Sequence, residues 1–238
     1  MNIFITGIEN NCGKTMISAG LAAVMQSLGY KTAVYKPIQT GAIDKGKYLL
    51  SPDLTFVKMF DRYIKTHSTY MLKSKALPVV GAELERINID IEDIVNDYNI
   101  LKEKYDTLIT ESVGGLMTPI KENIFTAHIA KGLNIPVVFI VTPGSNNLNN
   151  CLNEINTAKT FGLDIVGVII NKFPLYSENP DIKVFPTLIE TYTDSKVLGL
   201  IKNFKGKSVQ TNILFNEILN GIDVEDVFRV KIPKLHGM

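Results

Sequence analysis

The amino-acid sequence predicts an α/β protein, doubly wound, with a mostly parallel sheet and helices on both faces. Strand-like apolar runs alternate with stretches of helical spacing along the chain, which is the pattern of βαβ units. Residues 136–141 and 165–170 are apolar without alternation, as is typical of parallel strands covered on both faces. No repeat, linker or low-complexity segment interrupts the pattern, so we expect a single domain over residues 1–238.

The composition excludes several classes of function. A chain of 238 residues with 45% hydrophobic and 21% charged residues has the content of an ordinary soluble domain. Its formal net charge of +1 gives no electrostatic reason to expect nucleic acid or an acidic membrane as a partner. Residues 1–6 lack a secretory signal, and no run approaches the ~20 apolar residues of a membrane helix. Cys12 and Cys151 are too few for a disulfide scaffold. We expect a cytoplasmic, soluble protein.

The first elements form a phosphate-binding motif. A short apolar strand at residues 3–5 precedes the loop from Gly7 to Thr15, which ends in Gly-Lys-Thr, and residues with helical spacing follow. The loop amides and the helix N-terminus favour a polyphosphate, Lys14 would reach its terminal phosphates, and the Thr15 hydroxyl would bind Mg²⁺. Gly7 and Gly13 enclose five residues where four are usual, but the strand before and the helix after favour a P-loop NTPase type of fold.

The remaining elements follow in alternation. A strand at 31–35 ends at Lys36, because Pro37 cannot continue a central strand. A helix is predicted from Ser51 to about residue 62, with Ser51 as the N-cap, Pro52 at the first helical position and Asp53 as an acid in the first turn. We expect a loop at 38–48, a mixed segment at 64–86 with Pro78 and Gly81 as breakers, and a loop at 174–186. The other predicted helices are 90–104, 126–132, 146–161, 187–192 and 210–221, and the other predicted strands are 107–110, 136–141, 165–170 and 197–201.

Four of the predicted strands end in polar groups, namely the phosphate loop, Lys36, Glu111 and Asn171. Ligands of doubly wound sheets bind beyond the carboxyl ends of the strands, so we expect these groups to meet at one edge. Mg²⁺ prefers oxygen ligands and takes one or two carboxylates beside phosphate oxygens. Thr15 and Glu111 are candidate ligands; Asp53 is either a third ligand or an acid that stabilises the start of its helix.

The same residues resemble the dethiobiotin synthetase family. The phosphate loop of that family has the five-residue spacing, and its second strand leads into Lys-Pro-x-x-(Ser/Thr)-Gly, matched by residues 36–41. Asp53, the acid and glycine-rich block at 111–115, and Asn171 match as well. The resemblance covers nearly the whole chain and weakens beyond Asn171.

The resemblance implies a ring-closing ligase that uses ATP as co-substrate and Mg²⁺ as cofactor. Its substrates would be 7,8-diaminononanoate (7,8-diaminopelargonate) and CO₂, joined through a carbamate and a phosphorylated carbamate, and the chain would act as a homodimer. Lys36 and Lys14 would be catalytic, Lys36 and Thr40 would bind the substrate, and Thr15, Asp53 and Glu111 would bind the metal. The implied ATP-binding residues are Asn11, Cys12, Gly13, Lys14, Thr15, Met16, Asp53, Glu111, Ser112, Val113, Gly114, Asn171 and Lys172. Asn171 would read the adenine edge.

Some positions depart from the family pattern and leave alternatives open. These positions are Asn10, Ser112, Val113, Asn150 and Lys202. An altered substrate is one alternative, as in an amide-forming ligase of the same phosphate-loop group. A second is a regulatory ATPase that works by dimer switching, although such proteins commonly carry another lysine early in the loop, where this chain has residues 8–11 without one. A third is a non-catalytic binding module.

Overall fold

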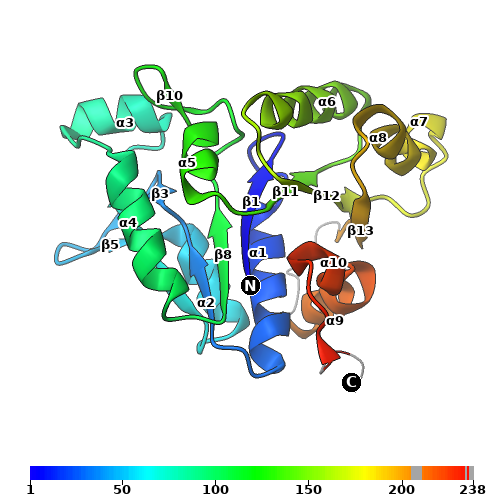
Figure 1. The fold of residues 1–238 in the computed structure, drawn as a ribbon, viewed down its shortest axis with the longest axis horizontal. Coiled ribbons are helices and arrows are strands. Elements are labelled where there is room, and N and C mark those ends of the chain that lie inside the picture. The colour runs from blue at the N-terminus through cyan, green and yellow to red at the C-terminus, as the bar shows by residue number, and fades with distance from the viewer. Residues whose placement is uncertain (205–210, 234, 236–238) are drawn as a thin grey trace.

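A seven-stranded sheet forms the centre of the computed structural model, which describes residues 1–204, 211–233 and 235. The strand order is β13-β12-β11-β1-β8-β2-β6, and the pairings between these neighbours are parallel. Figure 1 shows the strands and the surrounding helices. The strands are β1 (Asn2–Gly7), β2 (Thr32–Tyr35), β6 (Lys65–His67), β8 (Thr107–Glu111), β11 (Val137–Val141), β12 (Ile165–Phe173) and β13 (Val197–Lys202).

Helices cover both faces of this sheet. Neighbouring residues of each strand point to opposite faces, so one strand contributes side chains to two separate apolar clusters. Ile3 and Ile5 of β1 belong to one apolar cluster, with the first helix, whereas Phe4 between them belongs to a second cluster. The first cluster includes residues of α1 (Lys14–Ser27), α2 (Pro52–Phe60), α9 (Thr211–Gly221) and α10 (Val224–Phe228). The second includes residues of α3 (Pro78–Glu85), α4 (Ile91–Lys102), α5 (Thr126–Leu133), α6 (Ser145–Thr160) and α8 (Phe185–Thr193). The fold is the predicted doubly wound one, and the single seven-stranded central sheet supports our proposal of one domain.

The segments between the main elements differ from the sequence predictions in three places. The predicted loop at 38–48 contains the short strands β3 (Ile38–Gln39) and β4 (Ile43–Asp44), and β5 (Leu49–Leu50) follows it. The predicted mixed segment at 64–86 contains β6, β7 (Tyr70–Met71) and the helix α3. The predicted loop at 174–186 contains α7 (Pro180–Lys183) and the start of α8. β9 (Pro119–Lys121) and β10 (Ile124–Phe125) form a further hairpin.

The helix α3 was missed because its two supposed breakers fit the helix. Pro78 is the first helical residue, where a missing backbone N–H leaves no hydrogen bond unmade. Gly81 lies inside the helix, and a Cβ there would come within 3.2 Å of Leu72 Cδ1. The glycine therefore allows a close approach between α3 and the segment after β7.

The other predicted helices and strands are present with shifted ends. Ser51 caps α2 as expected, since its side chain accepts a hydrogen bond from Leu54 N. β12 continues past the predicted end at Asn171 to Phe173, with Lys172 at a φ of 56°. The last predicted helix begins at Thr211, and Gln210 lies outside the described residues. Of the described helices, none combines the length and the apolar character needed to cross a membrane.

Candidate active site

The phosphate loop connects β1 to α1 through a left-handed glycine. Gly13 has a φ of 100°, and a side chain there would collide with Asn171 Nδ2. Asn171 Nδ2 donates a 2.7 Å hydrogen bond to the carbonyl of Cys12, so a side chain of β12 anchors the backbone of the phosphate loop. The Cys12 side chain is fully buried below Gly7, where a Cβ would meet its sulfur atom. The loop thus has a fixed backbone whose shape depends on these two glycines.

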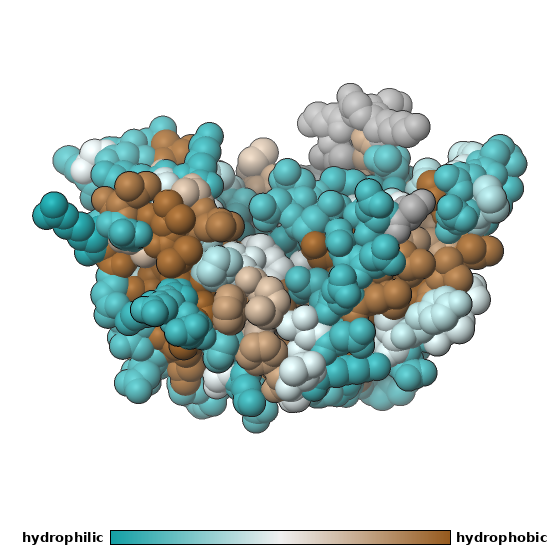
Figure 2. Space-filling view, turned by 90° about the horizontal axis from the view of Figure 1, so that it is seen from above, coloured by the Kyte–Doolittle hydropathy of each residue, from teal (hydrophilic) through white to brown (hydrophobic). Residues whose placement is uncertain are grey.

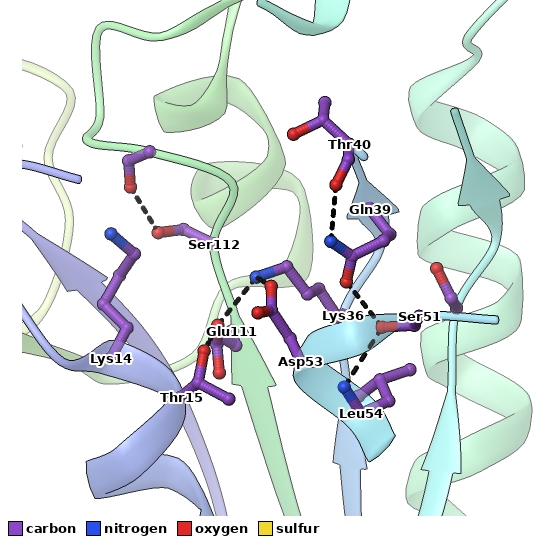
Figure 3. A network of polar contacts seen from close by, with 12 residues as sticks. Lys14, Thr15, Lys36, Gln39, Thr40, Ser51, Asp53, Leu54, Glu111 and Ser112 are labelled. Atoms are coloured by element: carbon purple, nitrogen blue, oxygen red, sulfur yellow. Dashed lines mark hydrogen bonds and ion pairs between the residues drawn. The ribbon is translucent and has the colours of Figure 1, made fainter. Parts of the chain in front are cut away.

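A three-charge cluster lies beside this loop, at the ends of β2 and β8. Lys36 Nζ is 2.7 Å from Glu111 Oε1 and 2.5 Å from Asp53 Oδ2. Thr15 Oγ1 donates a 2.8 Å hydrogen bond to the same Glu111 oxygen. Figure 3 shows these side chains converging from α1, α2, β8 and the end of β2, with Lys14 nearby. The four predicted strand ends therefore meet at one edge of the sheet.

The cluster carries one more negative than positive charge among Lys36, Glu111 and Asp53. Burial alone lowers the pKa of Lys36, but the charges of Glu111 and Asp53 outweigh it and raise that pKa above its ordinary value. Lys36 is therefore a firmly protonated cation. Glu111 is 1% exposed, and its Oε2 has no hydrogen-bond partner among the described residues.

This unpartnered oxygen fits a magnesium site. A buried carboxylate oxygen without a partner is costly, and a bound cation would satisfy it. The hydroxyl of Thr15 and the carboxylates of Glu111 and Asp53 are the hard oxygen donors that Mg²⁺ takes together with phosphate oxygens. Among the described residues there is no group of three or more His, Cys, Asp or Glu side chains that could hold a metal ion by itself.

A second polar chain fixes the position of Asp53. Gln39 is buried, its Nε2 donates to the carbonyl of Thr40 at 2.7 Å, and its Oε1 accepts from Ser51 Oγ at 2.5 Å. Ser51 in turn caps α2, in whose first turn Asp53 lies. Figure 3 shows this chain beside the three-charge cluster. Gln39 therefore connects the Thr40 segment to the helix that presents Asp53 to Lys36.

The site opens into a cavity of about 820 Å³. This volume falls in the range of small-molecule sites. The phosphate loop lines one part of it, and the segment from Gln39 to Gly41 lines another, with the three-charge cluster also on the wall. The lining residues are Asn10, Asn11, Gly13, Lys14, Thr15, Met16, Lys36, Gln39, Thr40, Gly41, Pro52, Asp53, Phe56, Lys75, Glu111, Val113, Gly114 and Lys172.

Comparisons with known proteins agree with this geometry. Residues 1–208 match a family model described as an AAA domain. The ATP-dependent dethiobiotin synthetase BioD of Fusobacterium nucleatum is 31% identical over 187 residues, which are 77% of this chain and 84% of that protein. This chain belongs to the dethiobiotin synthetase family. The BioD protein of Bacillus subtilis is 27% identical over 213 residues, 87% of this chain and 90% of that protein. As a member of this family the chain is an ATP-dependent ligase.

Solved structures with the same fold belong to other proteins. The cell division ATPase MinD of Pyrococcus furiosus has a TM-score of 0.58 at 16% identity and covers 96% of this chain and 98% of that one. A ParA family ATPase of Chlorobium tepidum has a TM-score of 0.54 at 13% identity, over 99% of this chain and 94% of that one. At these identities the likeness supports the phosphate-loop fold alone.

The site residues predicted for this chain fall into two groups. Most line the cavity: Asn11, Gly13, Lys14, Thr15, Met16, Lys36, Thr40, Asp53, Glu111, Val113, Gly114 and Lys172. Cys12, Ser112 and Asn171 do not, and each is almost fully buried behind the loops. Ser112 Oγ donates to the Gly114 carbonyl at 2.7 Å, which shapes the glycine-rich block. Contact of these three side chains with nucleotide stays a prediction.

The five positions that depart from the family pattern lie in different parts of the structure. Asn10 lines the cavity, as does Val113. Asn150 is exposed on α6. Lys202 Nζ forms a 2.5 Å ion pair with Glu217 of α9. Two of the five positions therefore lie on the cavity wall.

Besides Asn10, six residues of the site were not predicted as site residues, and two of them, Gly41 and Pro52, line the cavity within segments that the sequence did single out. Gln39, Phe56 and Lys75 line the cavity, and Glu154 of α6 accepts a 2.8 Å hydrogen bond from Leu116 N at the end of the glycine-rich block. Gln39 lies inside the matched Lys-Pro block, so its place in that motif was a signal. Phe56 lies three residues after Asp53 in the predicted helix, and this spacing was its signal. Lys75 and Glu154 come from segments brought to the site by tertiary packing, and no motif marks them.

Proposed function

We propose that the protein closes the ureido ring of dethiobiotin from 7,8-diaminononanoate and CO₂, with ATP as co-substrate and Mg²⁺ as cofactor. The observation that carries the proposal is Lys36, a buried cation held by Glu111 and Asp53 on the wall of the cavity that the phosphate loop lines. A carbamate and a triphosphate are both anions, so their approach requires fixed positive charge.

The chemistry proceeds in three steps. An amine nitrogen of the diamine bonds to the carbon of CO₂ and releases a proton to solvent, which gives a carbamate. A carbamate oxygen takes the γ-phosphoryl group of ATP, and ADP leaves. The second amine attacks the same carbon, phosphate leaves, and the ring closes with loss of a proton. Such transfers need alignment and charge neutralisation from the protein.

Each proposed residue has a place in these steps. Lys14 binds the terminal phosphates, Lys36 lies between the carbamate and the γ-phosphate, and Thr40 hydrogen-bonds the substrate. Mg²⁺ bound by Thr15, Glu111 and Asp53 with phosphate oxygens would neutralise charge on the triphosphate.

The adenine edge is assigned to Asn171. Its Oδ1 is an acceptor without a partner among the described residues, but the side chain is 0% exposed and does not line the cavity, so a hydrogen bond from the adenine amine would require this side chain to become exposed when nucleotide binds. Lys172 lines the cavity beside it, and its Nζ donates to the Asn11 carbonyl at 2.6 Å.

One assay tests the proposal against its alternatives. ATP consumption is measured with bicarbonate and Mg²⁺, with and without the diamine, and the product is identified by mass. Diamine-dependent ADP release with formation of dethiobiotin is expected. Diamine-independent turnover would instead favour an ATPase of the dimer-switching kind, and the absence of turnover would favour a binding module. The loop itself argues against the switch, because such proteins commonly carry a second lysine early in the phosphate loop and residues 8–11 of this chain contain none.

We also propose that two copies of the chain associate as a homodimer. Figure 2, seen from above, shows hydrophobic side chains gathered on the left, on the side of α3, and on the right, on the side of α7 and α8. Exposed apolar residues of these regions are Leu77, Val80, Leu84, Leu175, Tyr176, Val184 and Tyr192. Sedimentation at several concentrations tests the state, and a monomer at all of them would refute it.

A further inference from the structure

The segment after β7 is tied to the Thr40 side of the cavity by backbone hydrogen bonds. Leu72 N donates to the Gln39 carbonyl at 2.7 Å, and Ala42 N donates back to the Leu72 carbonyl at 2.8 Å. Gly41 N donates to the Ser74 carbonyl at 2.7 Å. Ser74 N is held in turn by the carboxylate of Glu85 on α3, at 2.8 Å. The backbone that leads into Lys75 is therefore fixed against the cavity wall.

The side chain of Lys75 runs over Gly41. A Cβ built on Gly41 would lie 3.1 Å from Lys75 Cγ, and Gly41 has a φ of 70°. Both features favour glycine at this position. Lys75 lines the same cavity as Thr40 and Gly41 and is exposed, so its methylene groups cover Gly41 and its ammonium group is accessible to a ligand at the mouth of the cavity.

The charges around the cavity distinguish Lys75 from the other lysines. Lys36 is neutralised by two carboxylates. Lys14 Nζ donates to the Glu9 carbonyl at 3.1 Å, and Lys172 Nζ donates to the Asn11 carbonyl. Lys75 makes no hydrogen bond or ion pair within the part of the chain that the structure describes. It is the cation most available to an incoming anion on the Thr40 side.

We propose that Lys75 is a substrate-binding residue that holds the carboxylate group of the carbamate, on the Thr40 side of the cavity. The inference rests on the proposed function, because it requires that a carbamate forms there. The carbamate brings a new negative charge to a place where Lys36 already balances two acids. A charge-assisted hydrogen bond from an ammonium group to a carboxylate is about twice as strong as a neutral one. Lys75 supplies that bond.

The test compares Lys75→Gln with Lys73→Gln. Lys73 is two residues away, exposed, and 3.6 Å from Asp44 Oδ2, and it does not line the cavity, so it is the matched control. Diamine binding is titrated by calorimetry in the presence of Mg²⁺ and a non-hydrolysable ATP analogue, in buffers with and without bicarbonate. Bicarbonate should tighten diamine binding to the wild type and to Lys73→Gln by about tenfold, and this gain should be lost in Lys75→Gln. Lys75→Arg should keep part of it.

Steady-state kinetics give a second readout. Lys75→Gln should raise KM for bicarbonate by about tenfold and change kcat less, because the bond forms before phosphoryl transfer. A bicarbonate effect in Lys75→Gln equal to that of the wild type would overturn the role of Lys75 and leave the proposed function standing. Weaker binding of the nucleotide alone in Lys75→Gln would assign the residue to ATP and overturn the inference as well. A wild type without diamine-dependent turnover would remove the proposed function and this inference together.

Discussion

Lys36 Nζ and Glu111 Oε1 lie 2.7 Å apart, although their residues are 75 positions apart in the sequence and belong to the ends of neighbouring parallel strands. Both side chains are buried, at 7% and 1% exposure. The contact places a cation beside the Thr15 hydroxyl, which donates to the same Glu111 oxygen. A metal that binds Glu111 must therefore share this carboxylate with Lys36 or displace it. A metal on the unpartnered Oε2 would share the carboxylate, whereas a metal that displaces Lys36 would free its ammonium group to face the reacting anions.

Replacement of Lys36 by Gln should lower kcat by about 100-fold, because a positioned charge that stabilises a transition state contributes on this order. It should also lower the free energy of unfolding by about 3 kcal/mol, because Glu111 would stay buried without its cation. Turnover and urea denaturation measure the two effects separately. Lys65→Gln, an exposed lysine on β6, is the control and should change neither. Near-normal kcat in a folded Lys36→Gln variant would remove Lys36 from the catalytic set.

Replacement of Glu111 by Gln should weaken the dependence of activity on Mg²⁺. The amide keeps an oxygen for Thr15 but loses the charge that a metal prefers, and half-saturation in a Mg²⁺ titration should rise by about tenfold. The comparison variant is Glu103→Gln, at the exposed end of α4. An unchanged titration in Glu111→Gln would mean that Glu111 serves only to hold Lys36 and Thr15.

Much of this site was predictable because its backbone geometry is dictated locally. The loop ending in Gly13, Lys14 and Thr15, the strand end before Pro37, and the cap at Ser51 all carry their structure in neighbouring residues. Parallel strands then bring their ends to one edge whatever their distance in the sequence. These steps place Lys36, Asp53 and Glu111 near the phosphate loop without knowledge of the side-chain contacts.

The remainder depends on packing between distant segments. Lys75 reaches the cavity because Leu72 and Ser74 bond to the backbone of residues 39–42, a pairing that no periodicity in the sequence signals. Gly81 looked like a breaker, but the close contact with Leu72 makes it suitable inside α3. The hydrogen bond from Asn171 Nδ2 to the carbonyl of Cys12 joins β12 to a loop 159 positions earlier, and no local pattern predicts it. Such contacts follow from tertiary structure, which overrides local preference.

Replacement of Gly13 by Ala should abolish most nucleotide binding. An alanine there would adopt an unfavourable φ and would collide with Asn171 Nδ2, so the loop must move away from the phosphate position. Gly46→Ala separates the cost of the backbone conformation from the cost of the collision, because Gly46 has a φ of 78° but nothing within 4 Å of its Cβ position. We expect Gly46→Ala to lower the free energy of unfolding by about 1 kcal/mol and to bind a fluorescent ATP analogue normally. Equal affinity in both variants would show that the collision with Asn171 is unimportant.

Replacement of Glu154 by Gln should change the pH dependence of stability. Burial raises the pKa of Glu154 above its ordinary value of 4.5; the hydrogen bond from Leu116 N and the charge of Lys14 only partly oppose this effect. Between the ordinary pKa and the raised one, the folded protein binds more protons at this site than the unfolded chain does. The contribution of the group to the free energy of unfolding is therefore fully present below about pH 4.5 and is lost as the pH rises through the raised pKa.

Gln cannot titrate but can still accept the hydrogen bond from Leu116 N. Glu154→Gln should thus gain stability relative to the wild type as the pH rises from 4 to about 7. Urea denaturation of both proteins at several pH values measures the difference, with Glu103→Gln as the exposed control. If the wild type and Glu154→Gln differ by a constant amount across this range, the carboxylate of Glu154 is not destabilised by burial, and its role reduces to the hydrogen bond that holds the glycine-rich block.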